Sequence, residues 1–278
     1  MESKLSRPSS HGPHGPVVTL LTDFGSRDAY VGCMKGVLLS RAPSLRSIVD
    51  LTHDVPAQDT RAATFHLRHA WAWFPTGTVH VAVVDPGVGT ERAILVARHE
   101  GHFFLAPDNG LLAPILEPTD AVHALDVTHY PAPSATFHGR DLFAPAAARL
   151  VEGATLEELG PGLRPGQWIG ATEPGPRIEA DRIAGRVEHV DRFGNLILDV
   201  PGAALGVDTG DWVVEIQGVR VDFAPTYGSA GVGALLALVD SYDRVEIAER
   251  GGDASSRLDV GRGTPVTLLR AGATRRQP

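Results

Sequence analysis

An acidic residue and an arginine stand seven residues apart in the segment 85–92, which reads DPGVGTER. An arginine folded back onto Asp85 would hold this carboxylate ionised, and an ionised carboxylate can orient a water molecule and accept its proton. The usual phosphate-binding patterns do not fit, because no Gly-Lys-Ser/Thr triplet follows and Arg92 occupies the place of the third glycine of the dinucleotide fingerprint. The segment predicts either a site for acid–base chemistry or a structural loop with a surface ion pair.

A histidine with acidic and basic neighbours lies in the segment 136–141, which reads TFHGRD and comes directly before a predicted helix. An imidazole at a junction between a loop and a helix can orient a reacting group or relay a proton. His138 is therefore a candidate for proton chemistry.

The segment 22–25, TDFG, follows a predicted strand and is followed by a second acid, Asp28. The carboxylate of Asp23 could accept hydrogen bonds from two vicinal hydroxyls, such as those of a ribose. An Asx turn or a helix N-cap is the structural alternative.

A fourth candidate segment, 191–195, reads DRFGN and lies in the second half of the chain. Phe193 could cover the face of a base, and Asn195 could bond an amide or amino group. A plain hairpin turn is the alternative.

A metal site is a competing interpretation of some of the same residues. The residue types suit a metal hydrolase, but no HExxH-like pair at helical spacing supports one. The candidate ligands are His53, Asp54, Asp85, His138 and Asp141.

Alternating strands and helices must position the first three segments. Apolar runs and helical spacing predict a sheet that is at least partly parallel and covered by helices, an arrangement that places ligands at the strand ends. Tyr30 is counted among the apolar positions of the first helix, and the lone Cys33 is expected to be a small core residue. We predict strands at 17–21, 48–51, 78–84, 93–97 and 102–105, and helices at 28–41, 58–74 and 141–151.

The pattern changes after about residue 173, where short β-like runs separated by Gly and Asp turns replace the helices. This pattern indicates a small β-barrel or sandwich. We therefore expect an N-terminal α/β domain over 1–173 and a C-terminal β-barrel domain over 174–278. The predicted strands of the second domain are 183–189, 196–200, 212–216, 219–223, 235–239, 245–248 and 265–269.

The composition narrows the class of protein. The chain has 278 residues, a formal net charge of −8 and no large basic cluster, which disfavours a nucleic-acid binder. One cysteine excludes an intramolecular disulfide and a Cys-rich zinc site. The first 16 residues contain no hydrophobic stretch, and no apolar run is long enough for a membrane span. We expect a cytoplasmic protein with no membrane or nucleic-acid partner.

Taken together and in this order, the four segments resemble those of the S-adenosylmethionine (SAM) hydrolases, also called SAM hydroxide adenosyltransferases, which are related to fluorinase and chlorinase. The resemblance runs from Val17 to about Leu269. It implies an enzyme that hydrolyses SAM at the ribose C5′ to adenosine and methionine, with SAM as the substrate and no cofactor or metal.

The resemblance also implies roles for individual residues. Asp85, Arg92 and His138 would form the catalytic set, and Asp23 would hold the ribose hydroxyls. The remaining residues would bind substrate, at the methionine end (Asp28, Asp191), around the adenosyl group (Phe193, Asn195, Tyr227) or elsewhere in the pocket (Phe137, Gly139, Ser241, Ala248, Gly251).

Two departures from the family's pattern concern the end of the chain. Glu249-Arg250 stands where the family usually carries Asn after the Glu-Ile-Ala stretch, and Tyr242-Asp243 replaces a turn that usually contains glycine. In the halide-using relatives a Tyr matches Asp85, so a carboxylate there predicts hydrolysis rather than halogenation.

The resemblance further implies a homotrimer in which each site lies between the first domain of one subunit and the second domain of its neighbour. Three alternatives stay open: a halogenase-like adenosyltransferase, a SAM- or nucleoside-binding protein without turnover, and a metal-dependent phosphate-ester hydrolase.

Overall fold

The computed structural model describes residues 15–170, 174–207 and 209–270. The chain folds as two compact units, Met1–Thr172 and Glu173–Pro278. The boundary expected near residue 173 lies in the segment 171–173, outside the described residues. No helix of the described part of the chain is long and apolar enough to cross a membrane.

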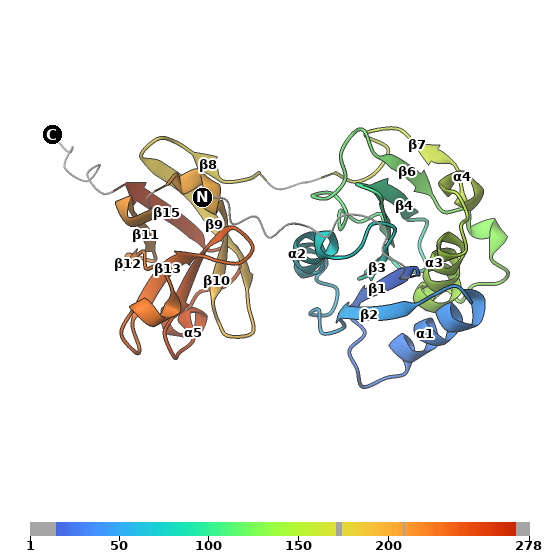
Figure 1. Cartoon of the computed structure of the whole chain (residues 1–278), viewed down its shortest axis with the longest axis horizontal. Helices are drawn as coiled ribbons and strands as arrows, with labels where there is room; N and C mark the ends of the chain where they lie inside the picture. Colours follow the sequence, from blue (N-terminus) through green and yellow to red (C-terminus); the bar gives the residue numbers. More distant parts are fainter. Residues whose placement is uncertain (1–14, 171–173, 208, 271–278) are drawn as a thin grey trace. The chain divides into compact units, whose positions relative to one another are not determined.

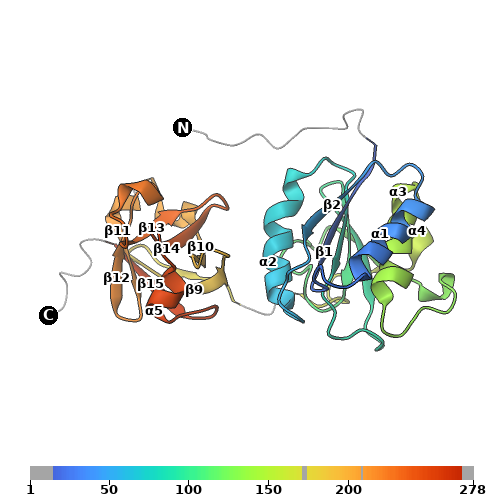
Figure 2. The same ribbon diagram turned by 90° about the horizontal axis from the view of Figure 1, so that it is seen from below.

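The first unit is a mixed sheet covered by helices on both faces (Figures 1 and 2). The strand order is β2-β1-β3-β5-β4-β6-β7. The strands β2, β1, β3 and β5 are parallel, whereas β4, β6 and β7 pair antiparallel. The strands are β1 Val17–Thr22, β2 Ser47–Thr52, β3 Val79–Val83, β4 Ile94–His99, β5 His102–Pro107, β6 Ala121–Ala124 and β7 Gly162–Leu163, and the helices are α1 Tyr30–Arg41, α2 Thr60–Ala70, α3 Ala144–Val151 and α4 Leu156–Leu159.

Alternation along the strands divides the core of this unit into two layers. Val18 and Leu20 of β1 pack with α1 and α3 on one face of the sheet, whereas Leu21 packs with α2 on the other. Successive side chains of a strand point to opposite faces, so one apolar strand supplies both layers. The predicted α/β class is confirmed.

The helices differ from their predicted bounds at their N-termini. Asp59 caps α2 by accepting from the backbone N–H of Ala62, so this helix begins at Thr60 rather than at Gln58. Likewise α1 begins at Tyr30 rather than at Asp28. A π-helical turn, Gly139–Phe143, precedes α3.

The expectation that Cys33 belongs to the core is wrong, because this side chain is exposed. The buried residues of α1 are Val31, Met34 and Leu38, which form one stripe at helical spacing, and Cys33 lies off that stripe.

The second unit is an antiparallel sheet of order β12-β11-β15-β9-β10-β14-β13, with β8 paired to β9. A bridge between Phe223 and Ala237 links the two ends of this order and nearly closes the sheet, so the predicted barrel-like class is confirmed. A short helix that the sequence pattern does not predict, α5 Ala254–Leu258, begins at the N-cap Asp253. The strands are β8 Arg177–Ile178, β9 Arg182–Val190, β10 Leu196–Pro201, β11 Trp212–Ile216, β12 Val219–Asp222, β13 Leu235–Val239, β14 Arg244–Glu249 and β15 Pro265–Arg270.

Candidate active site

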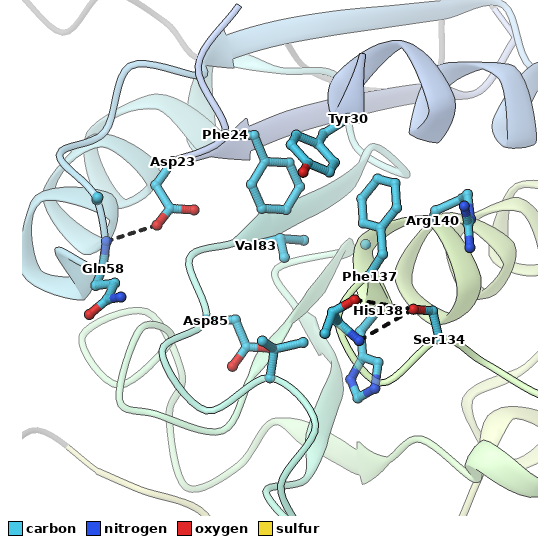
Figure 3. A pocket seen from close by; sticks show the side chains of 14 residues that line it. Asp23, Phe24, Tyr30, Gln58, Val83, Asp85, Ser134, Phe137, His138 and Arg140 are labelled. Atoms are coloured by element: carbon cyan, nitrogen blue, oxygen red, sulfur yellow. Dashed lines mark hydrogen bonds between the residues drawn. The ribbon is translucent and has the colours of Figure 1, made fainter. Parts of the chain in front are cut away.

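A pocket of about 580 Å³ lies where β1 and β3 end (Figure 3). Asp23 follows the last residue of β1, and Asp85 comes two residues after β3. Because these parallel strands are neighbours, their carboxyl ends meet at one edge of the sheet, and the segment 134–140 supplies a further wall. Three segments far apart in the sequence thus meet in one cavity.

Asp85, Arg92 and His138 form a connected polar group at this pocket. Arg92 Nε donates to Asp85 Oδ1 at 2.9 Å, and its Nη2 donates to Asp85 Oδ2. The same Nη2 lies 2.9 Å from His138 Nδ1. The side chains of Asp85 and Arg92 are only 5% and 11% exposed, so the ion pair is largely protected from water. The pairing expected between Asp85 and Arg92 is present.

Burial and the arginine both affect the protonation of His138. Burial, and then the positive charge of Arg92, lower the pKa of His138 below its usual value, while Asp85 and Asp141 act in the opposite direction. Arginine can only donate, so Nδ1 of the neutral ring accepts its hydrogen bond and the ring proton is assigned to Nε2. In this state His138 can donate through Nε2, and the Asp85 carboxylate is the member of the group that could accept a proton.

A glycine allows the loop that carries Arg92 to approach the segment before His138. Gly89 has a φ of 81°, and a Cβ there would lie 2.6 Å from the carbonyl oxygen of Ala135. A side chain at position 89 would therefore separate the two loops that bring Arg92 and His138 together.

Asp23 lies on another wall of the pocket and is fixed from one side. The backbone N–H of Gln58 donates to Asp23 Oδ2 at 2.8 Å, as the dashed line in Figure 3 shows. Gln58 has a φ of 65°, in the left-handed region. Such strain is common at functional sites, and here it accompanies a backbone donor that orients a carboxylate toward the cavity.

Three aromatic rings, which lie together, also line the pocket (Figure 3). Phe24 and Tyr30 both contact Phe137, with ring centroids 6.0 and 5.1 Å apart. The Arg140 guanidinium lies 5.1 Å from the centroid of Phe137. Gly139 adjoins this cluster, since a Cβ there would lie 3.3 Å from both phenylalanine rings.

The pocket thus brings together Asp23, Asp85, Phe137, His138 and Gly139 of the predicted site. Arg92 contacts Asp85 and His138 without lining the cavity itself, and Asp28 is exposed and does not line it. The pocket is also lined by residues that were not predicted as site residues. Among them are Gln58, whose backbone conformation leaves no sequence signal, and Tyr30, which is 46% exposed.

The segment 191–195 forms the turn of the β9–β10 hairpin, as the structural alternative held. Asp191 Oδ1 accepts from the backbone N–H groups of Phe193 and Asn195 at 2.8 and 2.9 Å, and Asn195 Nδ2 donates to Asp191 Oδ2 at 3.0 Å. The turn leaves Phe193 73% exposed. An exposed aromatic ring on a rigid turn is suited to cover an apolar ligand face.

The other predicted residues of the second unit lie on and around β14. Tyr227 is half exposed, and its hydroxyl donates to Glu246 Oε1 at 2.7 Å. Ala248 is buried within β14, whereas Ser241 and Gly251 are exposed on the loops before and after it.

Four of the five residues of the competing metal site contact other side chains, and the fifth, Asp54, is exposed. Asp85 and His138 contact Arg92, Asp141 pairs with Arg140, and His53 contacts Asp50 and Thr22. Within residues 15–170, 174–207 and 209–270, no group of three or more His, Cys, Asp or Glu side chains is arranged to hold a metal ion.

Comparison with known proteins gives matches along both units. Residues 18–160 match the SAM hydroxide adenosyltransferase N-terminal domain, and residues 185–267 match the C-terminal domain. A protein from Salinispora tropica named (R)-S-adenosyl-L-methionine hydrolase is 40% identical over 265 residues, which cover 93% of this chain and 98% of that protein. A fluorinase from an Actinoplanes species is 26% identical over 92% of this chain and 98% of its own length. The crystal structure of a conserved protein from Thermotoga maritima superposes with a TM-score of 0.84 and 35% identity, covering 91% of this chain and all of the other.

Proposed function

The chain belongs to the SAM hydroxide adenosyltransferase family, and on that premise we propose that Asp85, Arg92 and His138 carry out its reaction. That reaction is the hydrolysis of SAM to adenosine and methionine, as the name of the 40% identical relative indicates. The observation that carries the assignment is the buried carboxylate of Asp85, held by Arg92 at the wall of the pocket.

The chemistry needs a base more than it needs an acid. Water attacks C5′, the C5′–S bond breaks, and its electron pair stays on sulfur, which leaves as the neutral thioether of methionine. The leaving group therefore requires no proton. Water is a weak nucleophile, so a base that accepts its proton accelerates the attack. Asp85 is this base.

Arg92 and His138 support this base in different ways. The bidentate pair with Arg92 fixes the direction of the Asp85 carboxylate. His138, neutral with its proton on Nε2, can donate a hydrogen bond to the attacking water without competing for its proton. Asp23 binds the ribose hydroxyls through the lone pairs left free by Gln58.

A carboxylate at position 85 also separates hydrolysis from halogenation. A desolvated halide beside an ionised carboxylate in a partly buried pocket would be repelled strongly. Incubation of the protein with SAM, with and without chloride or fluoride, tests this point. We expect equal amounts of adenosine and methionine at a rate that halide does not change. A 5′-halogenated nucleoside would support the halogenase alternative, and tight binding of SAM without products would support the binding protein.

We propose that the reaction needs no metal or other cofactor, since a sulfonium is already a good leaving group. Activity should survive exhaustive treatment with EDTA or phenanthroline. A loss that a divalent ion reverses would instead support a metallohydrolase.

We further propose that the protein acts as a homotrimer and that the second unit of a neighbouring subunit completes each pocket. Family resemblance and the exposure of Phe193 and Tyr227 support this proposal. The single cysteine, which permits no intramolecular disulfide, supports a cytoplasmic location. The net charge of −8 supports the absence of a nucleic-acid partner.

A further inference from the structure

The loop that carries Tyr227 is held at two points by β14 and the residue that follows it. The 3-10 turn Tyr227–Ser229 precedes β13, which pairs antiparallel with β14. Glu246 of β14 receives the Tyr227 hydroxyl at 2.7 Å. Arg250, directly after β14, donates through Nη1 to the carbonyl oxygens of Gly228, at 3.2 Å, and Ala230. One contact holds the ring and the other holds the backbone.

Glu246 is an unusual residue at its position. It is 3% exposed, and on its own face of β14 it lies opposite Leu238 of β13 and two residues before Ala248, which both belong to a small buried apolar cluster. A buried carboxylate reduces stability unless it is well bonded, so a strand that needed only to pack would carry an apolar residue there. The carboxylate instead accepts the hydrogen bond of the Tyr227 hydroxyl, which an apolar residue could not do.

Arg250 belongs to the segment that departs from the family's pattern, since this chain carries Glu249-Arg250 after the Glu-Ile-Ala stretch, where Asn is usual. The guanidinium can donate several hydrogen bonds in a fixed geometry, which suits two carbonyl oxygens of one turn.

We propose that Glu246 and Arg250 are positioning residues that hold the Tyr227 ring in the orientation that binds the adenosyl group. The inference rests on the proposed function, in which Tyr227 contacts that group. Neither residue acts on the reacting atoms, which the pocket of the first unit binds. Loss of either anchor therefore weakens the binding of ground state and transition state alike, so KM rises while kcat changes little.

Several ionisable groups surround Glu246. They are Tyr227 on the 3-10 turn, Asp240 after β13, Tyr242 in the following turn and Asp191 on the β9–β10 hairpin. Burial is the main cause that raises the pKa of Glu246 to about 7, and the charges of Asp240 and Asp191 raise it further, while the hydrogen bond from Tyr227 lowers it. The ionised carboxylate is the stronger acceptor, so the anchor on Tyr227 weakens as Glu246 becomes protonated.

The test compares KM and kcat for SAM in Tyr227→Phe, Glu246→Gln, their double variant, Arg250→Met and Arg250→Lys. Arg186→Met is the matched control, because Arg186 also donates to a backbone carbonyl of the second unit, that of Pro174 at 2.7 Å. We expect KM to rise about 3- to 10-fold in Tyr227→Phe and Arg250→Met, with kcat within about twofold of the wild type and partial recovery in Arg250→Lys. The double variant should be no worse than Tyr227→Phe, because both changes act on the same hydrogen bond: Tyr227→Phe removes its donor, and Glu246→Gln removes the charge of its acceptor.

Two further readouts separate positioning from a general loss of structure. The KM of the wild type should rise between pH 8 and pH 6, and this rise should be absent in Glu246→Gln. Calorimetry with adenosine should show the same weakening as KM in each variant. Unchanged KM and adenosine affinity in Tyr227→Phe and Arg250→Met, or equal losses in Arg186→Met, would overturn the proposal. A wild-type protein that forms no adenosine from SAM would refute the proposed function instead.

Discussion

The pocket of the first unit and the loops of the second hold their predicted site residues in different ways. In the first unit, Asp85, Arg92 and His138 are connected by hydrogen bonds, and the Asp85–Arg92 pair is largely buried. In the second unit, Phe193 and Tyr227 are 73% and 46% exposed, and hydrogen bonds to Asp191 and Glu246 hold them from within the unit. On the proposed roles, the reacting groups are thus preorganised by charge, whereas the recognition groups are held by hydrogen bonds from their own unit and keep an exposed surface for the ligand.

The largest effect should come from the preorganised group. Asp85→Asn removes the base but keeps the size and polarity of the side chain, so kcat should fall about 10³-fold while the Kd for SAM changes only a few-fold. Single-turnover kinetics and calorimetry measure the two quantities. Asp54→Asn is the control, because Asp54 is an exposed acid of the competing metal site. Loss of SAM binding in Asp85→Asn would mean that Asp85 holds the substrate instead, and an equal loss of activity in Asp54→Asn would support the metal site.

The next experiment tests whether the pocket residues of the first unit and the exposed residues of the second unit form one site from two different subunits. Asp85→Asn damages the first unit, and Asn195→Ala damages the hairpin turn of the second by removing the Asn195–Asp191 contact. Each variant alone should be nearly inactive. In randomly mixed trimers about a quarter of the sites would combine two intact halves and regain activity.

Mixed trimers that are well folded but inactive would mean that both halves of each site come from one chain. Mass spectrometry of differently tagged subunits provides the control that mixing has occurred.

A smaller effect is expected at the edge of the preorganised pocket. Asp23→Ala removes two hydrogen bonds from ribose hydroxyls to a charged acceptor, so KM should rise about 10- to 100-fold, with a smaller fall in kcat. Steady-state kinetics with SAM measure both. If Asp23→Ala left KM unchanged and lowered only kcat, the carboxylate would act in the chemistry and not in binding.

The smallest effect concerns the support of the recognition loop and is a gain in stability. Because burial raises the pKa of Glu246 to about 7, from 4.5, its contribution is fully present below about pH 4.5 and is lost as the pH rises through 7. Gln cannot ionise, so Glu246→Gln should not lose this stability as the pH rises. The variant should be more stable than the wild type at pH 8, by about 1–2 kcal/mol after allowance for solvent screening, and no more stable at pH 4.5.

Urea unfolding at the two pH values checks this prediction. A variant less stable at pH 8 would mean that Glu246 contributes to the stability of the fold. A more stable variant with a higher KM would mean that Glu246 contributes to substrate binding at the expense of stability.

The sequence predicted the two architectures because long alternating or helical patterns determine them. It missed the short elements β6, β7, β8, α4 and α5, which contain too few residues to show a period. Even so, α4 has a signal, since Thr155 and Glu158 form a capping box. Spacing alone suggested the pairing of Asp85 with Arg92.

The remaining site residues could not be predicted in the same way. The donor to Asp23 is a backbone N–H in a left-handed conformation at Gln58, which no residue type signals. The partner of Tyr227 lies 19 residues away, on a strand whose neighbouring residues face an apolar core. Tertiary contacts of this kind depend on how the strands pair.

The most direct test of the central claim, that solvent water attacks C5′ of SAM, is the fate of the solvent oxygen. Adenosine formed from SAM in ¹⁸O-enriched water should carry ¹⁸O in its 5′-hydroxyl at the enrichment of the solvent, as mass spectrometry of the nucleoside and its fragments would show. Adenosine without the label, or a label at any other position, would contradict the account.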